Sequence, residues 1–223
     1  MNLILTSDFP ATANDVVVEH IRNLGARPRV AWIPPFTAQG RARFRAAQDV
    51  FQAFGVADLE YCDIDAEPNA GQLDQLDQYD AIYLTGGDPL GFRRNLHRCG
   101  LAARIPQYLA AGRLVIAASG GAMQFTPNVS LFRLVNNPVA EVLVTHAEYQ
   151  ALGIVDYELL PHLNKLDTAF LEKVQRYSEG IQHDIVALAD GAVLIHEAAG
   201  AYRCVGQAVK LRGGAQTPVA NAA

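Results

Sequence analysis

Short apolar runs alternate with longer stretches of helical periodicity through the first half of the chain. The runs have the length and composition of buried strands, at residues 3–5, 29–33, 59–62, 81–84 and 114–117. The stretches between them carry apolar residues at helical spacing, at residues 15–23, 40–54, 71–75 and 101–110. This repeated order predicts an α/β fold with a doubly wound, mostly parallel sheet and helices on both faces. Ligands bind such sheets beyond the carboxyl ends of the strands.

The pattern changes after Pro127. Short extended runs are predicted at residues 131–135, 141–144 and 157–160, followed by a helix over residues 167–177. Three more β-rich runs, at residues 185–188, 192–196 and 202–205, indicate a C-terminal β-rich extension, with a turn at 189–191. The last stretch, 213–223, is small and polar. We therefore expect one domain over residues 1–212 and a flexible tail.

Composition narrows the functional classes. Of the 223 residues, 50% are hydrophobic and 18% are charged, which is enough apolar surface for one globular core. The net charge is −5 and no Lys/Arg-rich block is present, so we expect neither a nucleic-acid nor a membrane partner. A small peptide or amide substrate is favoured instead, with the chain a monomer or homodimer. The N-terminal run is too short for a signal peptide, and the three cysteines lack metal-type spacing; both points favour a cytoplasmic location.

Ser119 stands where an apolar run meets a glycine pair, in the stretch IAASGGAM. A strand, a sharp turn and a helix start are all compatible with this stretch, which is the arrangement of a nucleophile elbow. The small residues Ala117 and Gly121 would leave room for a serine thrust outward, and a helix N-terminus there would favour negative charge. A serine-glycine turn without chemistry explains the stretch equally well. Ser119 alone therefore leaves both interpretations open.

A second glycine pair, Gly86-Gly87, follows the predicted strand at 81–84. The carboxyl ends of neighbouring parallel strands meet at one edge, so the N–H groups of Gly87 and Gly120 could together form an oxyanion hole. The alternative is a turn in which Asp88 caps a helix, and that role is compatible with the first.

His162 ends an apolar run in the stretch LLPHLN. A histidine at the end of a strand can meet Ser119 across the edge of the sheet, and its ordinary pKa near 6.5 suits a general base. A lone histidine is more often structural. Of the others, His146 is a second choice.

Three motifs in this order, TGGD, ASGGAM and LLPHLN, resemble the serine peptidase family of dipeptidase E (aspartyl dipeptidase) and cyanophycinase. The later segment ALADGAVLIHE is similar to a strand pair of that family, so the resemblance covers most of the chain. It implies the flavodoxin-like fold of class I glutamine amidotransferases, with serine in place of their cysteine. It also implies that Ser119 is the nucleophile, that His162 is the base, and that the N–H groups of Gly87 and Gly120 hold the oxyanion. The implied chemistry is acyl transfer to serine and then to water.

The chain departs from this family at the residue that orients the histidine. The family places an acidic residue between the serine and the histidine, whereas the best-matching position here holds Asn137. An asparagine can fix the tautomer of an imidazole, but it offers no negative charge. Glu141 lies four residues further on, and Asp156 and Glu158 are nearer the histidine in sequence. We expect Asn137 or Glu141 to contact His162, the first favoured by position and the second by chemistry.

A second departure follows the histidine. Aspartyl dipeptidases resemble H-x-G-E-T-R-x-x-R-I at this point, a charged run tied to recognition of an N-terminal aspartyl residue, whereas this chain has NKLDTAFLEK. An amphipathic helix explains that segment. Preference for aspartyl substrates is therefore not implied.

Two functional classes follow from these observations. The first is a serine hydrolase, a peptidase acting on dipeptides or short amides. The second is a non-catalytic, amidotransferase-like binding or regulatory domain that has lost the triad acid. An α/β-hydrolase esterase is disfavoured because only 43 residues separate serine from histidine, and a glutamine amidotransferase because no cysteine stands at the elbow. No cofactor or metal is expected, since the sequence lacks H-E-x-x-H or clustered His/Asp spacing.

Overall fold

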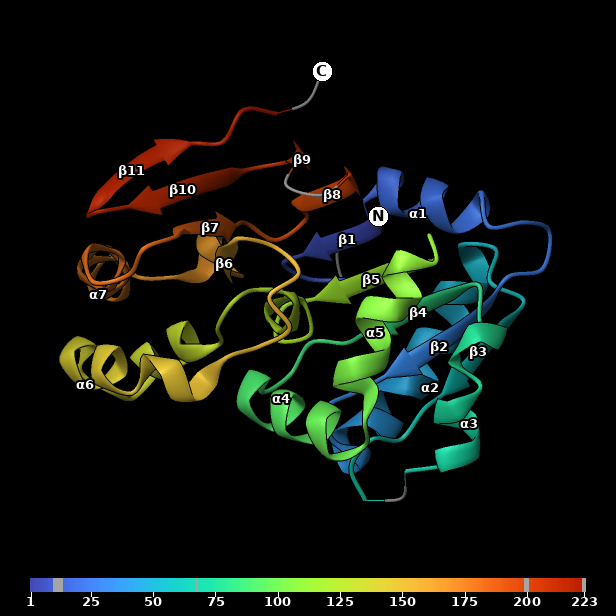
Figure 1. Cartoon of the computed structure of the whole chain (residues 1–223). Coiled ribbons are helices and arrows are strands. Elements are labelled where there is room, and N and C mark those ends of the chain that lie inside the picture. Colours follow the sequence, from blue (N-terminus) through green and yellow to red (C-terminus); the bar gives the residue numbers. More distant parts are fainter. Residues whose placement is uncertain (10–13, 67, 199–200, 222–223) are drawn as a thin grey trace.

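The computed structural model describes residues 1–9, 14–66, 68–198 and 201–221, which build two sheets flanked by helices (Figure 1). Within these residues the larger sheet has seven strands in the order β3-β2-β4-β5-β1-β8-β9. The first five strands of that order run parallel, and the last two are antiparallel to their neighbours. Their bounds, in chain order, are β1 (Asn2–Thr6), β2 (Arg29–Ile33), β3 (Asp58–Tyr61), β4 (Ala81–Leu84), β5 (Leu114–Ala118), β8 (Val193–Ala198) and β9 (Ala201–Val205).

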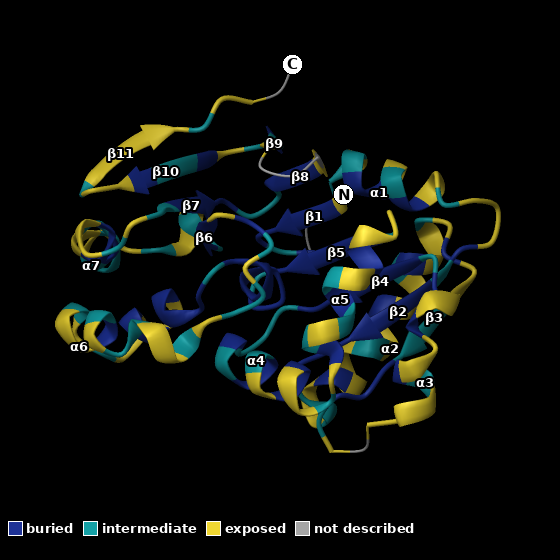
Figure 2. Cartoon of the chain, viewed as in Figure 1, coloured by how far each residue is buried: buried dark blue, intermediate teal, exposed yellow. Residues whose placement is uncertain are grey.

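Helices cover both faces of this sheet. On one face lie α1 (Asp15–Arg22) and α2 (Thr37–Ala53), and on the other lie α4 (Pro89–Arg98) and α5 (Leu101–Ala110). Each face carries its own hydrophobic core. In β1, Ile4 packs in the core beneath α1 and α2, while Leu3 and Leu5 pack in the core beneath α4 and α5, because successive side chains of a strand point to opposite faces. Burial on both faces explains why the central strands read as unbroken apolar runs (Figure 2). The short helix α3 (Ala70–Asp74) lies between β3 and β4 in the chain.

A second sheet forms the C-terminal extension. It consists of β6 (Tyr157–Leu160), β7 (Asp184–Leu188), β10 (Ala208–Arg212) and β11 (Ala215–Pro218), in the order β11-β10-β7-β6. Strands β6 and β7 are parallel and are joined through α7 (Thr168–Glu179). The residues that follow β6 and β7 therefore leave the sheet at the same edge. These features confirm the predicted fold class, including the helices on both faces and the β-rich extension.

Two predicted extended runs are helical in the structure. Residues 131–135 lie in a 3₁₀ helix (Ser130–Val135), in which Leu131 and Leu134 are buried while Phe132 and Val135 are exposed. Burial at every third position suits a 3₁₀ helix, in which side chains three residues apart are in line. Residues 141–144 lie in α6 (Val139–Val144). Short apolar runs do not distinguish helix from strand, which is why these predictions were wrong.

The predicted tail is partly a strand. Gly213 and Gly214, both with positive φ, form the turn of a hairpin in which β11 pairs antiparallel with β10. All four residues of β11 are exposed, so its pairing with β10 depends on backbone hydrogen bonds. Because the strand buries no side chain, its sequence shows no apolar periodicity. The boundary expected at residue 212 thus falls inside one hairpin. The final two residues, 222–223, lie outside the described residues, so the expectation of a flexible end is untested there.

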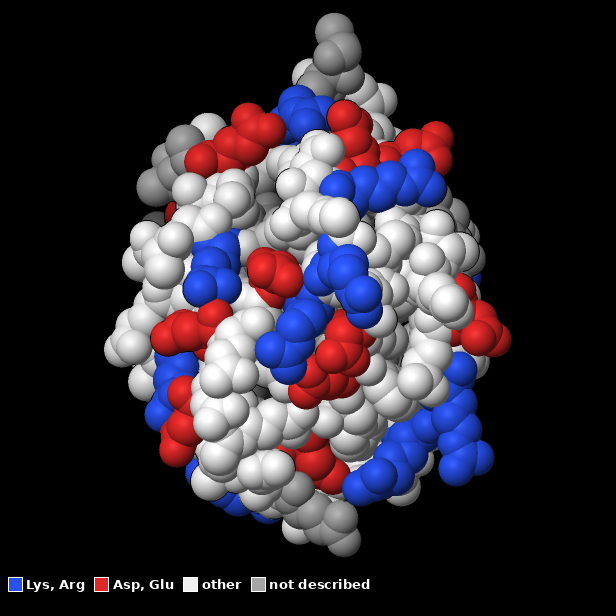
Figure 3. Space-filling model, turned by 90° about the vertical axis from the view of Figure 1, so that its right-hand side faces the viewer, with Lys and Arg blue, Asp and Glu red and all other residues white. Residues whose placement is uncertain are grey.

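Charged side chains of both signs are interspersed over the face shown in Figure 3, in keeping with the absence of a Lys/Arg-rich block from the sequence. Among the described residues, none of the helices combines the length and the apolar character needed to cross a bilayer.

Candidate functional site

Ser119 and His162 have an unusual backbone conformation. Among the described residues, they are the two non-glycine residues with positive φ, 47° and 62° respectively. Side chains with a Cβ rarely adopt this conformation, and residues held in it concentrate at functional sites. Ser119 directly follows β5, and His162 comes two residues after β6. The structure thus places both residues in strained turns at strand ends.

The turn at Ser119 has the packing of a nucleophile elbow. A Cβ atom at Gly120 would lie 2.0 Å from the carbonyl oxygen of Gly87, and one at Gly121 would lie 2.5 Å from that of Thr85. Both positions therefore require glycine. The peptide N–H of Ser119 donates to a β1 carbonyl at 2.9 Å, and its own carbonyl accepts the N–H of Met123 at 3.0 Å, which begins a short 3₁₀ helix (Ala122–Phe125). The expected strand, turn and helix start are all present.

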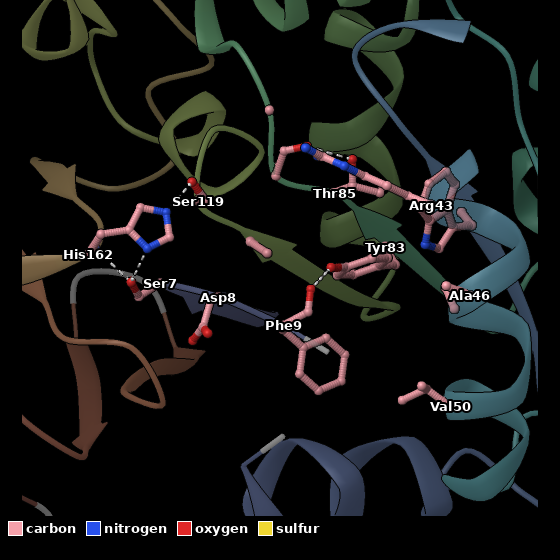
Figure 4. Close-up of a pocket in the computed structure, with 15 residues that line it drawn as sticks. Ser7, Asp8, Phe9, Arg43, Ala46, Val50, Tyr83, Thr85, Ser119 and His162 are labelled. Atoms are coloured by element: carbon pink, nitrogen blue, oxygen red, sulfur yellow. Dashed lines mark hydrogen bonds between the residues drawn. The ribbon is translucent and has the colours of Figure 1, made fainter. Parts of the chain in front are cut away.

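The imidazole of His162 bridges a hydroxyl and a carboxylate. Its Nε2 lies 3.1 Å from Ser119 Oγ, and its Nδ1 lies 2.6 Å from Asp190 Oδ1. In Figure 4 the ring lies between the hydroxyls of Ser119 and Ser7. Asp190 stands in the turn after β7, the parallel neighbour of β6, so histidine and carboxylate leave the smaller sheet at one edge. The arrangement can pass a proton from the hydroxyl to a ring whose charged form is stabilised by the carboxylate.

Asp190 is held ionised by its surroundings. Ser7 Oγ donates to Asp190 Oδ1 at 2.8 Å and accepts the backbone N–H of His162 at 2.7 Å, while the ammonium of Lys165 contacts Oδ2. Burial raises the pKa of Asp190, but hydrogen bonds from Lys165, His162 and Ser7 outweigh it and lower the pKa to about 2. The N–H of Asp190 also donates to Asn164 Oδ1 at 2.8 Å. The carboxylate is therefore both charged and fixed in place at neutral pH.

Asn137 and Glu141, the residues expected to orient His162, contact other groups. Asn137 Nδ2 donates to Glu141 Oε1 at 2.7 Å, and the same carboxylate pairs with Arg133 at 3.2 Å. Asn137 lies in the turn before α6, and Glu141 lies in the first turn of that helix. The Nδ1 atom of His162 instead contacts Asp190. The expectation was wrong because it placed the acid between serine and histidine in the chain, whereas the carboxylate comes from the next strand of the sheet.

The other nearby acids are also directed elsewhere. Glu158 points into the interior and accepts a hydrogen bond from Tyr177. Asp156 lines a separate cavity beside His196. The sequence did carry a sign of the correct residue, because Asp190 follows a predicted strand as His162 does.

The N–H groups of Gly87 and Gly120 lie in the two turns that pack against each other at Ser119. Gly87 has φ of 147°, and a Cβ atom there would lie 2.5 Å from a carbon of Pro35. In the part of the chain that the structure describes, neither N–H has a backbone acceptor. Two N–H groups without a backbone acceptor, beside the turn that carries Ser119, are suited to bind an oxyanion.

Two cavities meet at Ser119 and His162. The larger, about 480 Å³, extends between β1 and α2 and is lined by apolar residues together with polar and aromatic ones that include Asp8, Trp32 and Arg43. Figure 4 shows Asp8 and Arg43 on different sides of this cavity. The smaller cavity, about 180 Å³, is lined mainly by apolar side chains, among them Leu131, Phe132, Val135, Leu160, Leu166 and Phe170. A ligand at the hydroxyl of Ser119 can therefore occupy two different environments.

Comparisons with a family model, with curated proteins and with solved structures all find similarity to peptidases. The model of a family described as "Peptidase family S51" matches residues 3–202. An uncharacterized peptidase of Listeria monocytogenes is 32% identical over 180 residues, which cover 78% of this chain and 83% of the relative. An uncharacterized peptidase of Pasteurella multocida is 26% identical over 176 residues, which cover 78% of this chain and 82% of the relative.

Two solved structures share the fold. A Listeria monocytogenes protein assigned as a peptidase E has a TM-score of 0.69 at 24% identity, covering 95% of this chain and 98% of that one. A peptidase from an acI-B1 Actinobacterium has a TM-score of 0.76 at 16% identity, covering 99% and 94%.

The contact between Gly120 and Gly87 can be tested by adding one methyl group. Gly120→Ala must displace a backbone carbonyl, because its Cβ would lie 2.0 Å from Gly87 O, so we expect a loss of about 1–3 kcal/mol in the free energy of unfolding. Chemical denaturation measures the loss. The control is Gly71→Ala in α3, whose Cβ would come no closer than 3.4 Å to its nearest neighbour and should be neutral or stabilising. Equal stability of the Gly120→Ala variant and the wild type would contradict the tight packing.

The low pKa of Asp190 makes stability depend on acid pH. Its pKa is about 2 in the folded chain against about 3.9 when unfolded, so its contribution is complete above about pH 4 and is lost as pH falls to 2. We expect Asp190→Asn to lower the free energy of unfolding at pH 7 by roughly 1–2 kcal/mol, and by progressively less towards pH 2. Urea titrations at several pH values test this, with the exposed Asp49→Asn as control. A difference between wild type and Asp190→Asn that is the same at pH 7 and pH 2 would refute it.

Proposed function

The chain belongs to peptidase family S51, and we propose that it is a serine-type peptidase that cleaves dipeptides or short amide substrates through an acyl-serine intermediate. One observation carries this proposal: the unbroken line of hydrogen-bond contacts from Ser119 through His162 to Asp190. The rival interpretation, a binding domain that has lost its acid, depended on the absence of a carboxylate beside the histidine. Asp190 supplies that carboxylate, which favours catalysis.

The proposed reaction uses the same groups in both of its halves, the acylation of Ser119 and its hydrolysis by water. His162 Nε2 accepts the hydroxyl proton as Ser119 Oγ attacks the carbonyl carbon of the scissile amide, and Asp190 stabilises the imidazolium. The N–H groups of Gly87 and Gly120 stabilise the oxyanion. His162 then gives its proton to the leaving amine. Water repeats the sequence on the acyl-serine and frees the acid product.

The larger cavity favours a short peptide with charged ends. Asp8, which accepts the N–H of Gly191, and Arg43, which donates to the carbonyl of Gly86, bring charges of both signs to this cavity. These charges can also pair with an ammonium and a carboxylate, the two termini of a dipeptide. Trp32, a further lining residue, is 2% exposed, and its indole Nε1 is one of the buried polar atoms that have no partner among the described residues. An indole N–H is a donor that a bound substrate can satisfy.

The smaller cavity favours an apolar side chain on one side of the scissile bond. Phe132, Leu166 and Phe170 line it, and no Lys or Arg side chain is among its lining residues in the described part of the chain. An acidic side chain would lose hydration there without gaining a cationic partner. We therefore place the substrate preference among peptides with an apolar residue, apart from the aspartyl preference of dipeptidase E.

A cytoplasmic location and a monomeric or homodimeric state stay predictions. The free thiols of Cys62, Cys99 and Cys204 are compatible with a reducing compartment.

Ser119 can be tested by covalent labelling and by turnover. The wild type should react with a fluorophosphonate at one site and hydrolyse members of a dipeptide library. Ser119→Ala should do neither, because the Ser119 hydroxyl forms the covalent bond to the phosphonate in the first reaction and to the acyl group in the second. Intact-mass spectrometry and amine release measure the two effects. Ser178→Ala is the matched control for labelling, since it removes a hydroxyl from α7, outside both cavities, and leaves Ser119, His162 and Asp190 in place. Labelling that persists in Ser119→Ala, or disappears in Ser178→Ala while that variant stays folded, would contradict the assignment.

The apolar cavity can be tested by placing a charge at its rim. Phe132→Glu should lower kcat/KM for dipeptides with Leu or Phe side chains by about 10- to 100-fold, because the side chain would meet a carboxylate where it now meets a ring. Val144→Glu is the control: Val144 is equally apolar, is 85% exposed and lies outside both cavities. Wild-type enzyme that prefers aspartyl over leucyl dipeptides would overturn the preference while leaving the peptidase function intact.

A further inference from the structure

A second cluster of chemically active side chains lies apart from Ser119. His146 begins a 3₁₀ helix (His146–Tyr149), Glu158 lies in β6 and His183 directly precedes β7. The Nε2 atoms of His146 and His183 lie 3.0 and 2.8 Å from the same oxygen, Glu158 Oε1. All three ligand atoms lie within 4.8 Å of one another. Two imidazoles therefore converge on one carboxylate oxygen.

The carboxylate of Glu158 is in an environment that costs free energy. Its side chain is completely buried, and in the described residues its ion-pair contacts are with the two histidines and with no Lys or Arg. Tyr177 donates its hydroxyl to this carboxylate, at 2.9 Å from Oε1 and 3.1 Å from Oε2. A buried charge requires a compensating charge as well as hydrogen bonds. A cation between the three ligands would supply that charge.

We propose that His146, Glu158 and His183 bind a divalent transition-metal ion, with zinc the best fit. Two imidazole nitrogens and one carboxylate oxygen form a ligand set that zinc favours, and water can complete a tetrahedral site. With ligand distances of about 2.0–2.1 Å, tetrahedral ligands are about 3.3 Å apart, so the two nitrogens need to move away from Oε1 by only a few tenths of an ångström.

The access and the charges suit this ion. The side chains of His146 and His183 are 26% and 20% exposed, so solvent reaches the outer side of the cluster while Glu158 closes the inner side. Tyr177 would bond the carboxylate oxygens from behind and fix their orientation, as groups beside metal ligands commonly do. The proton of each bound imidazole would reside on Nδ1.

The site would brace the smaller sheet. Its ligands are 12 and 25 residues apart in the chain, so the ion would join the segment before β6, β6 itself and the start of β7. These two strands lead into His162 and Asp190, respectively. Bound metal would thus stabilise the framework without touching the reacting atoms. The spacing also explains why no metal motif was found in the sequence.

Cobalt(II) titration of the purified full chain tests the proposal. We expect one Co²⁺ per chain, with the visible absorption of a tetrahedral site and its displacement by Zn²⁺, together with a rise in thermal midpoint on Zn²⁺ addition. His183→Ala and His146→Ala should each bind Co²⁺ more than about 100-fold more weakly, since even groups outside the ligand shell commonly change metal affinity 10- to 100-fold. If either alanine variant fails to fold by circular dichroism, His183→Gln, which keeps a side-chain donor for Glu158, replaces it.

Two control variants make the outcome decisive. His97→Ala removes an exposed histidine elsewhere, and His162→Ala removes the histidine beside Ser119; both should bind Co²⁺ as the wild type does. The proposal is overturned if the wild type binds neither ion in the micromolar range, which would leave the cluster as a hydrogen-bonded network. It is also overturned if binding survives in His183→Ala or is lost in His162→Ala.

Discussion

The contact between His162 and Asp190 is the constraint on which the rest of the site depends. Ser119 follows a strand of the larger sheet, whereas His162 and Asp190 follow strands of the smaller one. The site therefore exists only if the edges of the two sheets are held in a fixed relative position. Ser7, which directly follows β1 of the larger sheet, accepts the backbone N–H of His162 and donates to the carboxylate of Asp190. One hydroxyl thereby ties His162 and Asp190 of the smaller sheet to the larger sheet that carries Ser119.

Backbone strain at Ser119 and His162 and the hydrogen bonds around Asp190 both fix the orientation of these three residues. The positive φ of Ser119 and of His162 turns both side chains toward each other, at an energetic cost that the surrounding packing must offset. The close approach of Gly120 to Gly87 fixes one turn, and the hydrogen bonds around Asp190 fix the other. Because the carboxylate is already ionised and oriented, an imidazolium formed in the proposed proton transfer would meet a stabilising charge without rearrangement. The architecture therefore holds Ser119, His162 and Asp190 in fixed positions relative to one another.

Much of this could be predicted from the sequence, and the exceptions have physical reasons. Central strands such as β4 and β5 are buried on both faces, so their apolar runs identify them, and the small residues around Ser119 follow from steric demands of the elbow. Asp190 could not be found by chain order, because its proximity to His162 comes from the parallel pairing of β6 with β7 and not from sequence distance. Strand β11 was missed because it buries no side chain, and the helices at 130–135 and 139–144 because short apolar runs suit more than one conformation.

The identity of the residue that orients His162 separates this account from its rivals most directly. Steady-state hydrolysis of one dipeptide by wild type, Asp190→Asn and Asn137→Ala provides the measurement, with folding of each variant checked by circular dichroism. The account predicts that Asp190→Asn lowers kcat by about 1,000-fold or more, because an amide cannot stabilise the imidazolium, while Asn137→Ala stays within about twofold of the wild type. Full activity in Asp190→Asn, or a large loss in Asn137→Ala, would contradict it.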